Sequence, residues 1–212
     1  MRLDRFFVAE EEAGERTDRF LARKLGISRS LAQRLIREGA AVVGGSPAEP
    51  ARRLRPGEEV VVSWAGPGIK PIPFPLPIIY EDEAIVVVNK PRGLPVHSAG
   101  PSSRPTVVSA LLARGPLAGG PADRPGVVHR LDAPVSGALV LARTEEAHRS
   151  LVQQFKERKV LKEYLAVVEG EVEVEEGTIK GRIGRDPHEP WRMGLRDLGK
   201  EAVTEFVVLA RR

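Results

Sequence analysis

The spacing of apolar residues predicts a helix between Ser28 and Gly39. One arc of this helix is apolar and carries Leu31, Ala32, Leu35 and Ile36. The opposite arc is polar and carries Arg29, Gln33, Arg34 and Arg37. Because Ser28 can cap the first turn and Gly39 can end the last one, the pattern indicates an amphipathic helix with a basic face.

Short apolar runs bounded by turn residues predict strands along the rest of the chain. In the N-terminal quarter these runs are 41–43 and 58–64. Later strands are expected at 78–80, 85–89, 138–142, 164–168, 177–183 and 203–209, and helices at 106–114 and 145–159. Since strands outnumber helices and several adjoin directly, we expect an α+β fold with a mixed, mainly antiparallel sheet.

A proline-rich segment divides the chain. Residues 65–77 contain five prolines and two glycines, a composition that favours an extended, fairly stiff linker. We therefore expect a small domain over 1–64, a linker over 65–77 and a larger domain over 78–212. The linker should hold the first domain at a distance from the second, without tight packing between them.

Composition excludes several classes of protein. The chain has no cysteine, which rules out disulfides, a Cys–zinc site and a thiol nucleophile. No apolar stretch approaches the roughly 18–20 residues of a membrane helix, and the opening residues lack the apolar core of a signal peptide. We expect a monomeric, cytoplasmic protein without metal or cofactor. Low Asn, Gln and Met contents fit heat adaptation or, equally, a GC-rich genome.

Positive charge gathers near the N-terminus. The chain has 33 Lys and Arg against 29 Asp and Glu, which permits a polyanionic partner without requiring one. Between Arg16 and Arg37, however, seven cations accompany one acid. The basic helix face lies within this stretch, although a merely solvated face is the simpler interpretation of the charges alone.

One carboxylate stands in a setting that suits a nucleophile. Asp132 lies in the segment His129–Gly137, which reads His-Arg-Leu-Asp-Ala-Pro-Val-Ser-Gly. Pro134 restricts the residue before it and Gly137 permits a sharp backbone path, so Asp132 should sit on a rigid loop. An Asp followed by Ser and Gly is, by itself, more often an ordinary turn.

The whole segment resembles the His-Arg-Leu-Asp-x-x-Thr-Ser-Gly signature of pseudouridine synthases that isomerise uridines in large-subunit ribosomal RNA and transfer RNA. Asn89–His97 is similar to that family's Lys-Pro-x-Gly-x-x-Val-His loop, and Lys162–Gly170 to its Lys-x-Tyr strand. The three motifs follow the family's order, and the resemblance extends from about Ile78 onward. It implies a catalytic domain of the α+β class expected above.

The N-terminal part resembles a second family, the small αL RNA-binding domain named after a ribosomal small-subunit protein. The similar segments are Thr17–Leu21, Ser28–Ser30, Leu35–Gly39 and Pro56–Glu58. This resemblance implies that Arg29, Arg34 and Arg37 bind RNA phosphates. Such contacts add affinity but do not distinguish one RNA sequence from another.

The first resemblance also assigns candidate roles in the larger domain. It implies that Asp132 is the nucleophile, acting at the sugar's anomeric carbon or at the base ring. It places Tyr164 against the uracil, where stacking contributes about 1–3 kcal/mol. Arg130 is the candidate for the side chain that replaces the flipped base in the RNA stack, and a salt bridge within the loop is the alternative.

Four further residues are candidates around the substrate. Lys90 and Arg92 would contact phosphates, with exposed loop cations as the equal alternative. His129 and His97 occupy family positions that shape the substrate-binding loops, which favours a structural role over proton transfer.

Two departures from the family pattern stand out. Val135 occupies the position where Thr is usual, which should cost little. Nothing after Arg212 supplies the family's Gly-Arg-Thr-His-Gln-x-Arg-like motif, whose arginine pairs with the catalytic aspartate. We therefore expect a C-terminally incomplete catalytic domain in which Asp132 lacks that cation, and a buried carboxylate without a cation is poorly poised.

The sequence thus favours a cofactor-independent RNA pseudouridine synthase, with 23S ribosomal RNA as the favoured substrate and transfer RNA as another. The alternative is a truncated, non-catalytic RNA-binding protein of the same fold. An aspartate-dependent glycoside hydrolase fits less well, because it would need two carboxylates across a cleft and only Asp132 has a motif behind it.

Overall fold

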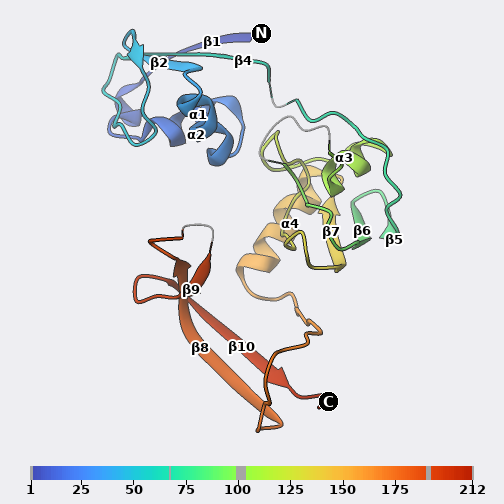
Figure 1. Cartoon of the computed structure of the whole chain (residues 1–212). Helices are drawn as coiled ribbons and strands as arrows, with labels where there is room; N and C mark the ends of the chain where they lie inside the picture. Colours follow the sequence, from blue (N-terminus) through green and yellow to red (C-terminus); the bar gives the residue numbers. More distant parts are fainter. Residues whose placement is uncertain (1, 67, 99–103, 190–191, 212) are drawn as a thin grey trace. The chain divides into compact units, whose positions relative to one another are not determined.

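The computed structural model describes residues 2–66, 68–98, 104–189 and 192–211. The chain divides into two compact units, 1–161 and 162–212 (Figure 1). Among the described residues of the first unit, buried apolar side chains form two clusters, one within residues 8–64 and the other within residues 76–141. In the described ranges, no helix is both long enough and apolar enough to cross a membrane.

The first cluster belongs to a small module of two helices and a four-stranded sheet (Figure 1). Its elements are β1 (Arg2–Phe7), η1 (Glu10–Glu12), α1 (Thr17–Leu25), α2 (Arg29–Arg37), β2 (Ala41–Val43), β3 (Ser46–Pro47) and β4 (Glu59–Trp64). The strand order is β1-β4-β2-β3, and the pairings are antiparallel. We call residues 2–64 the N-terminal module.

The predicted basic helix is confirmed as α2. The Ser28 hydroxyl caps it by accepting a hydrogen bond from the Leu31 amide at 3.3 Å. The predicted apolar arc of Leu31, Ala32, Leu35 and Ile36 is buried. Gly26, between α1 and α2, has φ +63°, a left-handed conformation that ends α1 and suits glycine. Local sequence signals therefore determine both the helix and its orientation.

The pattern of apolar residues did not predict β1 or β3. β1 contains as many charged as apolar residues, and Leu3 and Phe7 are both more than half exposed. It forms because its backbone pairs with β4 from Arg2 opposite Trp64 to Phe7 opposite Glu59. This pairing joins segments far apart in the sequence, so no local pattern reports it.

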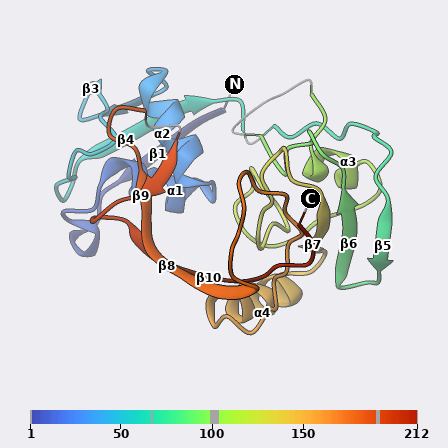
Figure 2. The same ribbon diagram turned by 60° about the horizontal axis from the view of Figure 1, so that its bottom comes forward.

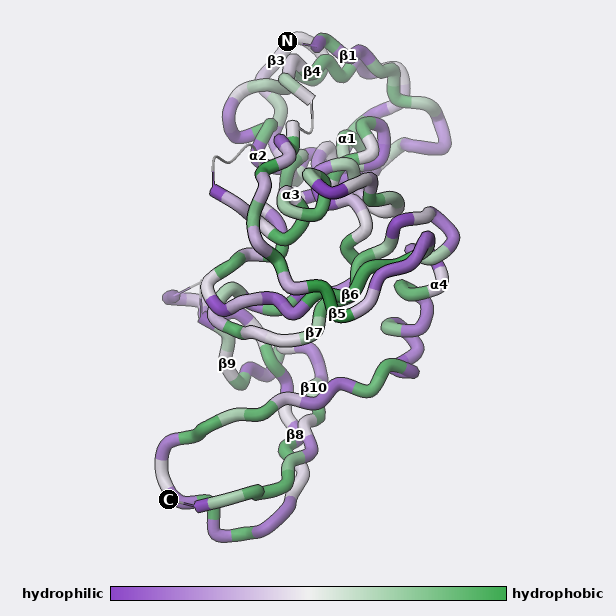
Figure 3. The backbone as a smooth tube through the Cα atoms, turned by 90° about the vertical axis from the view of Figure 1, so that its right-hand side faces the viewer, coloured by the Kyte–Doolittle hydropathy of each residue, from purple (hydrophilic) through white to green (hydrophobic). Residues whose placement is uncertain are grey.

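The second cluster surrounds a three-stranded sheet whose order is β5-β6-β7 (Figures 1 and 2). Its elements are β5 (Ile78–Glu81), β6 (Ile85–Lys90), α3 (Val107–Leu112), β7 (Gly137–Ala142) and α4 (Glu145–Lys156). All were predicted, and both strand pairings are antiparallel. The central strand β6 starts with four apolar residues, 85–88, which are green in the hydropathy colours of Figure 3, and its register places Lys90 opposite Gly137.

The segment predicted to be an extended linker, residues 65–77, packs against this second cluster. Within it, Pro67 lies outside the described residues, and the described remainder forms no helix or strand. Leu76 is buried, Ile69 and Phe74 are partly buried against the cluster, and the Ile72 amide donates to the Ser109 carbonyl at 3.0 Å. The segment is extended as expected, but its apolar residues anchor it.

The N-terminal module keeps a core of its own, but it contacts the loop at Ala122 and Asp123, which the expected separation did not predict. The Asp123 carboxylate accepts hydrogen bonds from the Ser28 amide, at 2.7 Å, and from the Ser28 hydroxyl. Nearby, the Ala122 amide donates to the Gly26 carbonyl at 2.9 Å. Both Ser28 and Asp123 are buried. We call the contact between Ser28 and Asp123, together with the neighbouring Ala122–Gly26 hydrogen bond, the Asp123 clasp.

The second unit is a separate antiparallel sheet of order β10-β8-β9. Its strands are β8 (Glu176–Arg185), β9 (Met193–Leu195) and β10 (Lys200–Val207). The strand expected at 164–168 is wrong, because 162–168 has no regular structure and Val167 is fully exposed. A strand needs a neighbour for its backbone groups, and no described strand pairs with this segment. The mainly antiparallel α+β prediction is confirmed.

Candidate active site

The Asp132 loop is held at the start of β7. The Val135 amide donates to the Asp132 carbonyl at 3.0 Å, which closes a tight turn, and Gly137 leads into the strand with φ +132°. That angle is rarely adopted by residues with a side chain. The rigid loop inferred from Pro134 and Gly137 is therefore present.

The Asp132 carboxylate points to solvent. Its side chain is 75% exposed, and Arg130 Nη2 donates to Asp132 Oδ1 at 3.4 Å while being 67% exposed itself. The expected burial of this carboxylate is thus wrong, and the salt bridge within the loop, which was the alternative role for Arg130, is present. An exposed ion pair of this kind contributes at most about 1 kcal/mol, so a ligand can displace it.

Lys90 ties this loop to its neighbour. The strand alternation that buries Val86 and Val88 also buries Lys90, whose side chain is fully shielded from solvent. Its Nζ donates to the carbonyls of Pro91 (3.1 Å), Leu94 (2.8 Å) and Ala133 (3.2 Å). Burial lowers the Lys90 pKa, and the charge of Asp132 raises it in part. In this position the ammonium faces protein carbonyls, whereas the sequence suggested a phosphate contact or, equally, an exposed loop cation.

The carbonyl of Ala133 completes the link between the two loops. It accepts a second hydrogen bond from the Gly93 amide at 2.7 Å. Gly93 has φ +87°, so the turn after Lys90 depends on glycine. Arg92, in the same turn, is exposed and remains a candidate for phosphate contact. The residue next to the candidate nucleophile is thereby fixed from two sides.

The two histidines sit near the loop in different environments. His129 Nε2 accepts a hydrogen bond from the Val140 amide at 3.1 Å, and its ring stacks on Phe155 with centroids 4.5 Å apart. These contacts support the structural role expected for His129. His97 is half-buried, and its Nδ1 has no hydrogen-bond partner among the described residues. Burial lowers the pKa of His97, as do the charges of Arg124 and Arg130.

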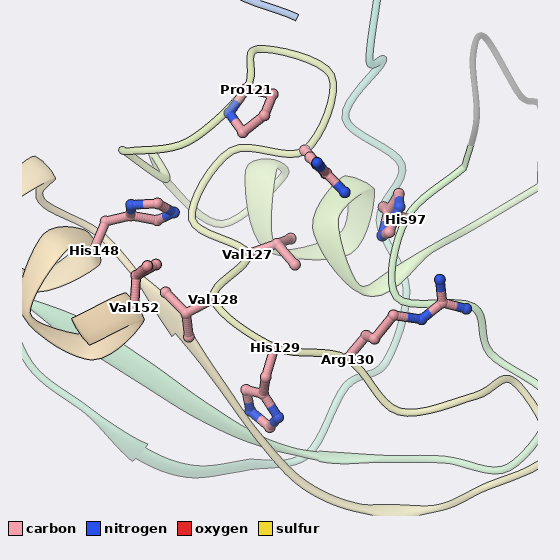
Figure 4. A pocket seen from close by; sticks show the side chains of 9 residues that line it. His97, Pro121, Val127, Val128, His129, Arg130, His148 and Val152 are labelled. Atoms are coloured by element: carbon pink, nitrogen blue, oxygen red, sulfur yellow. The ribbon is translucent and has the colours of Figure 1, made fainter. Parts of the chain in front are cut away.

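A cavity of about 320 Å³ lies beside Arg130 (Figure 4). Its lining combines three histidines, two arginines, three valines and one proline: His97, His129, His148, Arg124, Arg130, Val127, Val128, Val152 and Pro121. Arg124, Asp123 and His148 belong to no motif that the sequence offered. The only signal was a charged pair, Asp123-Arg124, inside an otherwise Gly- and Pro-rich loop.

The cations of α2 have different partners. Arg29 donates to Asp18 Oδ2 from Nε at 3.0 Å, whereas Arg34 lies 3.6 Å from Glu38 and Arg37 donates to Gln33 at 3.3 Å. Glu38 and Arg37 are exposed. The charge of Arg29 is therefore engaged inside the module, and those of Arg34 and Arg37 are less so.

Asp18 is the centre of this arrangement. Its side chain is buried and also accepts hydrogen bonds from Arg16, at 3.1 Å, and from Gln33, at 2.6 Å. Burial raises the pKa of Asp18, but the hydrogen bonds from Arg16, Gln33 and Arg29 outweigh it and hold the pKa well below its usual value. The single acid of the basic stretch thus clamps α1 to α2.

Tyr164 belongs to the second unit and is 64% exposed. The other candidates Asp132, Arg130, Lys90 and His129 lie together within the first unit.

Across the described residues, no cluster of three or more His, Asp or Glu side chains could hold a metal ion.

Comparison with known proteins identifies the family. A model of the RNA pseudouridylate synthase family matches residues 84–212, which include the Asp132 loop, and the S4 domain model matches residues 15–60. This chain belongs to the RNA pseudouridylate synthase family. Both resemblances drawn from the sequence motifs are confirmed, and the S4 domain coincides with α1, α2 and part of the sheet of the N-terminal module.

Relatives in this family match almost the whole chain. An uncharacterized RNA pseudouridine synthase of Aquifex aeolicus is 44% identical over 97% of this chain and 67% of its own length. A ribosomal large subunit pseudouridine synthase D of Neisseria meningitidis is 42% identical over 96% of this chain and 56% of its own length. The chain thus spans from just over half to two thirds of these relatives.

A solved structure supports the fold. The human RNA pseudouridylate synthase domain containing 1 is 30% identical, with a TM-score of 0.51 over 64% of this chain and 52% of that protein. The family likeness therefore extends to the three-dimensional arrangement.

Proposed function

We propose that this protein isomerises uridine to pseudouridine in RNA, with the Asp132 carboxylate as nucleophile. The observation that carries the proposal is the exposed Asp132 side chain, held on a loop fixed by Lys90 within the residues that match the family. An exposed carboxylate can reach a substrate, while the anchored backbone on either side limits the geometries it adopts.

The reaction needs no redox partner. The N1–C1′ bond of uridine breaks, the base turns, and a C5–C1′ bond forms, while C5 loses a proton and N1 gains one. A carboxylate is sufficient as nucleophile, attacking either the anomeric carbon or the base ring, and both routes remain open. Leu131 is buried and Asp132 is exposed, so the loop offers the carboxylate while its neighbour anchors in the core.

We propose large-subunit ribosomal RNA as the substrate, because the relative from Neisseria meningitidis is named for that activity. In this proposal the S4 domain holds RNA through Arg34, Arg37 and, less directly, Arg29, and Tyr164 stacks on the uracil. Arg130 is exposed beside Asp132, which suits entry into the space left by a flipped base. The protein would act as a cytoplasmic monomer.

The nucleophile is tested by Asp132→Asn, which is nearly isosteric. With ribosomal RNA transcripts carrying tritium at uridine C5, we expect wild-type protein to release tritium and the variant to release none above background. RNA affinity should stay within about twofold of wild type, because Asp132 contributes a repulsive rather than an attractive charge toward phosphate. Glu83→Gln, another exposed acid of the same unit, is the matched control and should remain active.

Each outcome separates the candidate functions. Turnover by Asp132→Asn at the wild-type rate would exclude this residue as the nucleophile. RNA binding without tritium release by the wild-type chain would favour the alternative, a non-catalytic RNA-binding protein of the same fold.

A further inference from the structure

The cavity of Figure 4 carries a concentration of positive charge on part of its wall. Arg124, Arg130 and His97 all line it. Burial lowers the pKa of His97, and the charges of the two arginines lower it further. Both guanidinium groups therefore lie close enough to His97 to act on it electrostatically. No carboxylate is among the residues that line the cavity.

The acids nearest in sequence offset this charge only in part. The charge of Asp123 raises the pKa of His97 and so opposes the two arginines. Asp123 is buried, where it accepts two hydrogen bonds from Ser28 in the Asp123 clasp. Asp132 meets only Arg130, at 3.4 Å and mostly in solvent. Across the described residues, the Arg124 side chain makes no ion pair or hydrogen bond. A half-buried guanidinium without an acid is a natural anion partner.

Within the described part of the chain, two of the histidines that line the cavity each have a buried ring nitrogen without a partner. His97 Nδ1 and His148 Nε2 are both shielded from solvent and make no hydrogen bond among the described residues. Leaving a buried polar atom unsatisfied costs about 1–3 kcal/mol, so a ligand or water that reached these nitrogens would stabilise the site. Both residues line this cavity.

We propose that this cavity binds a backbone phosphate of the RNA next to the target uridine, with Arg124 and His97 as the contacting side chains. The inference rests on the proposed function and names a further binding site for its substrate. Arg130 links the cavity to Asp132 because it lines the first and hydrogen bonds to the second. A phosphate there would draw Arg130 away from Asp132 and free the carboxylate for attack.

The rest of the lining suits a nucleotide in this position. Val127, Val128, Val152 and Pro121 offer apolar surface that a ribose or base edge can cover. The volume of about 320 Å³ lies at the small end of ligand pockets. The cavity is therefore matched to one phosphate with part of its nucleotide rather than to a larger ligand.

The test measures RNA binding without turnover, in the Asp132→Asn background. A fluorescein-labelled single-stranded RNA oligonucleotide is titrated at several KCl concentrations against Arg124→Gln, Arg124→Lys and Arg149→Gln. Removing one phosphate contact should reduce the slope of log K against log salt by about 0.7 for single-stranded RNA. We expect that loss for Arg124→Gln, retention for Arg124→Lys, and retention for Arg149→Gln, an exposed arginine of α4 outside the cavity lining.

A second arm identifies the source of the phosphate. Single neutral methylphosphonate linkages are placed one at a time along the oligonucleotide, and inorganic phosphate is titrated separately as a competitor. One linkage should weaken binding to the protein carrying Arg124 and leave the Arg124→Gln protein unaffected. Competition by inorganic phosphate with no sensitive linkage would point to a free-phosphate site and overturn the proposal.

The controls keep the result interpretable. An unchanged salt slope in Arg124→Gln would overturn the site even if the protein makes pseudouridine. Failure of the wild-type chain to release tritium would instead count against the proposed function, because the binding slopes do not depend on turnover. Arg124→Lys shows whether the charge at this position sets the salt slope, because it changes the side chain but keeps the charge and should keep the wild-type slope.

Discussion

At the scale of single residues, the charged side chains around the site divide by their environment. Lys90 and Asp18 are buried, and each meets several partners that hold a loop or a helix pair in place. Asp132 and Arg124 have few protein partners. A buried charge is tolerated only when it is hydrogen-bonded, so the first two are structural, whereas the second two are available to a ligand.

Acid should weaken the N-terminal module through Asp18. Because the pKa of Asp18 is lower in the folded chain than its ordinary value of 3.8, its stabilising contribution is complete above that value and is lost as pH falls through the folded pKa. We expect the free energy of urea unfolding to drop between about pH 5 and pH 1. Asp18→Asn should lower stability at pH 7 by about 1–3 kcal/mol and lack this part of the pH dependence.

The measurement for Asp18 is urea unfolding across this pH range, followed by circular dichroism or by amide resonances of the module. Glu49→Gln, an exposed acid of the same module, should keep the wild-type slope. Identical pH profiles for wild type and Asp18→Asn would contradict the role of the clamp.

At the scale of elements, α2 performs two tasks with one basic face. Toward its N-terminus, Arg29 and Gln33 bind Asp18 and thereby fix α2 against α1. Toward its C-terminus, Arg34 and Arg37 have weaker partners. The arginines that the sequence pattern treats as equivalent therefore differ in how freely they can meet RNA phosphates.

Single substitutions in α2 should separate these two tasks. We expect Arg37→Gln to reduce the salt slope of RNA binding by about 0.7–0.9 with a change in stability within about 0.5 kcal/mol. Arg29→Gln should lower the free energy of unfolding by about 1–2 kcal/mol, because it removes a charged partner of buried Asp18, and should change the salt slope less. Salt-dependent fluorescence anisotropy and urea unfolding measure the two effects. A loss of stability in Arg37→Gln together with a loss of salt slope in Arg29→Gln would refute this division of the helix.

At the scale of the molecule, the Asp123 clasp joins the N-terminal module to the loop that also supplies Arg124. Asp123 accepts hydrogen bonds from the Ser28 amide and hydroxyl, and the next residue lines the cavity. The same serine caps α2. The helix with the basic face and the proposed phosphate site are thereby attached to one another within the first unit.

Asp123→Asn should loosen this attachment without unfolding either part. The amide group keeps the size of the side chain but loses its charge, which weakens the contact by about 1–2 kcal/mol, a roughly 5- to 30-fold change in its equilibrium. Hydrogen exchange at the Ser28 amide should accelerate by that factor, while amides in β6 remain protected. Glu83→Gln is the control. Unchanged exchange at Ser28 would mean that Asp123 does not hold the two parts together.

Much of this protein follows from local sequence. The α2 helix, its Ser28 cap, the strands of the second cluster and the Asp132 loop were all predictable, because short-range spacing, capping residues and turn formers determine them. The motifs around Asp132 also identified the family, since the order of three motifs is written in the chain itself. The nucleophile candidate needed no structure.

The tertiary structure alone decided which charges are free and which are engaged. Lys90 is buried because it lies on the same face of strand β6 as Val86 and Val88. The alternation of residues places the three on one face, but only the tertiary structure shows that this face is covered. The Asp123 clasp joins residues 95 positions apart, and the pairing of β1 with β4 places Arg2 opposite Trp64. Burial and long-range hydrogen bonds depend on what folds against a residue, and no local pattern carries that information.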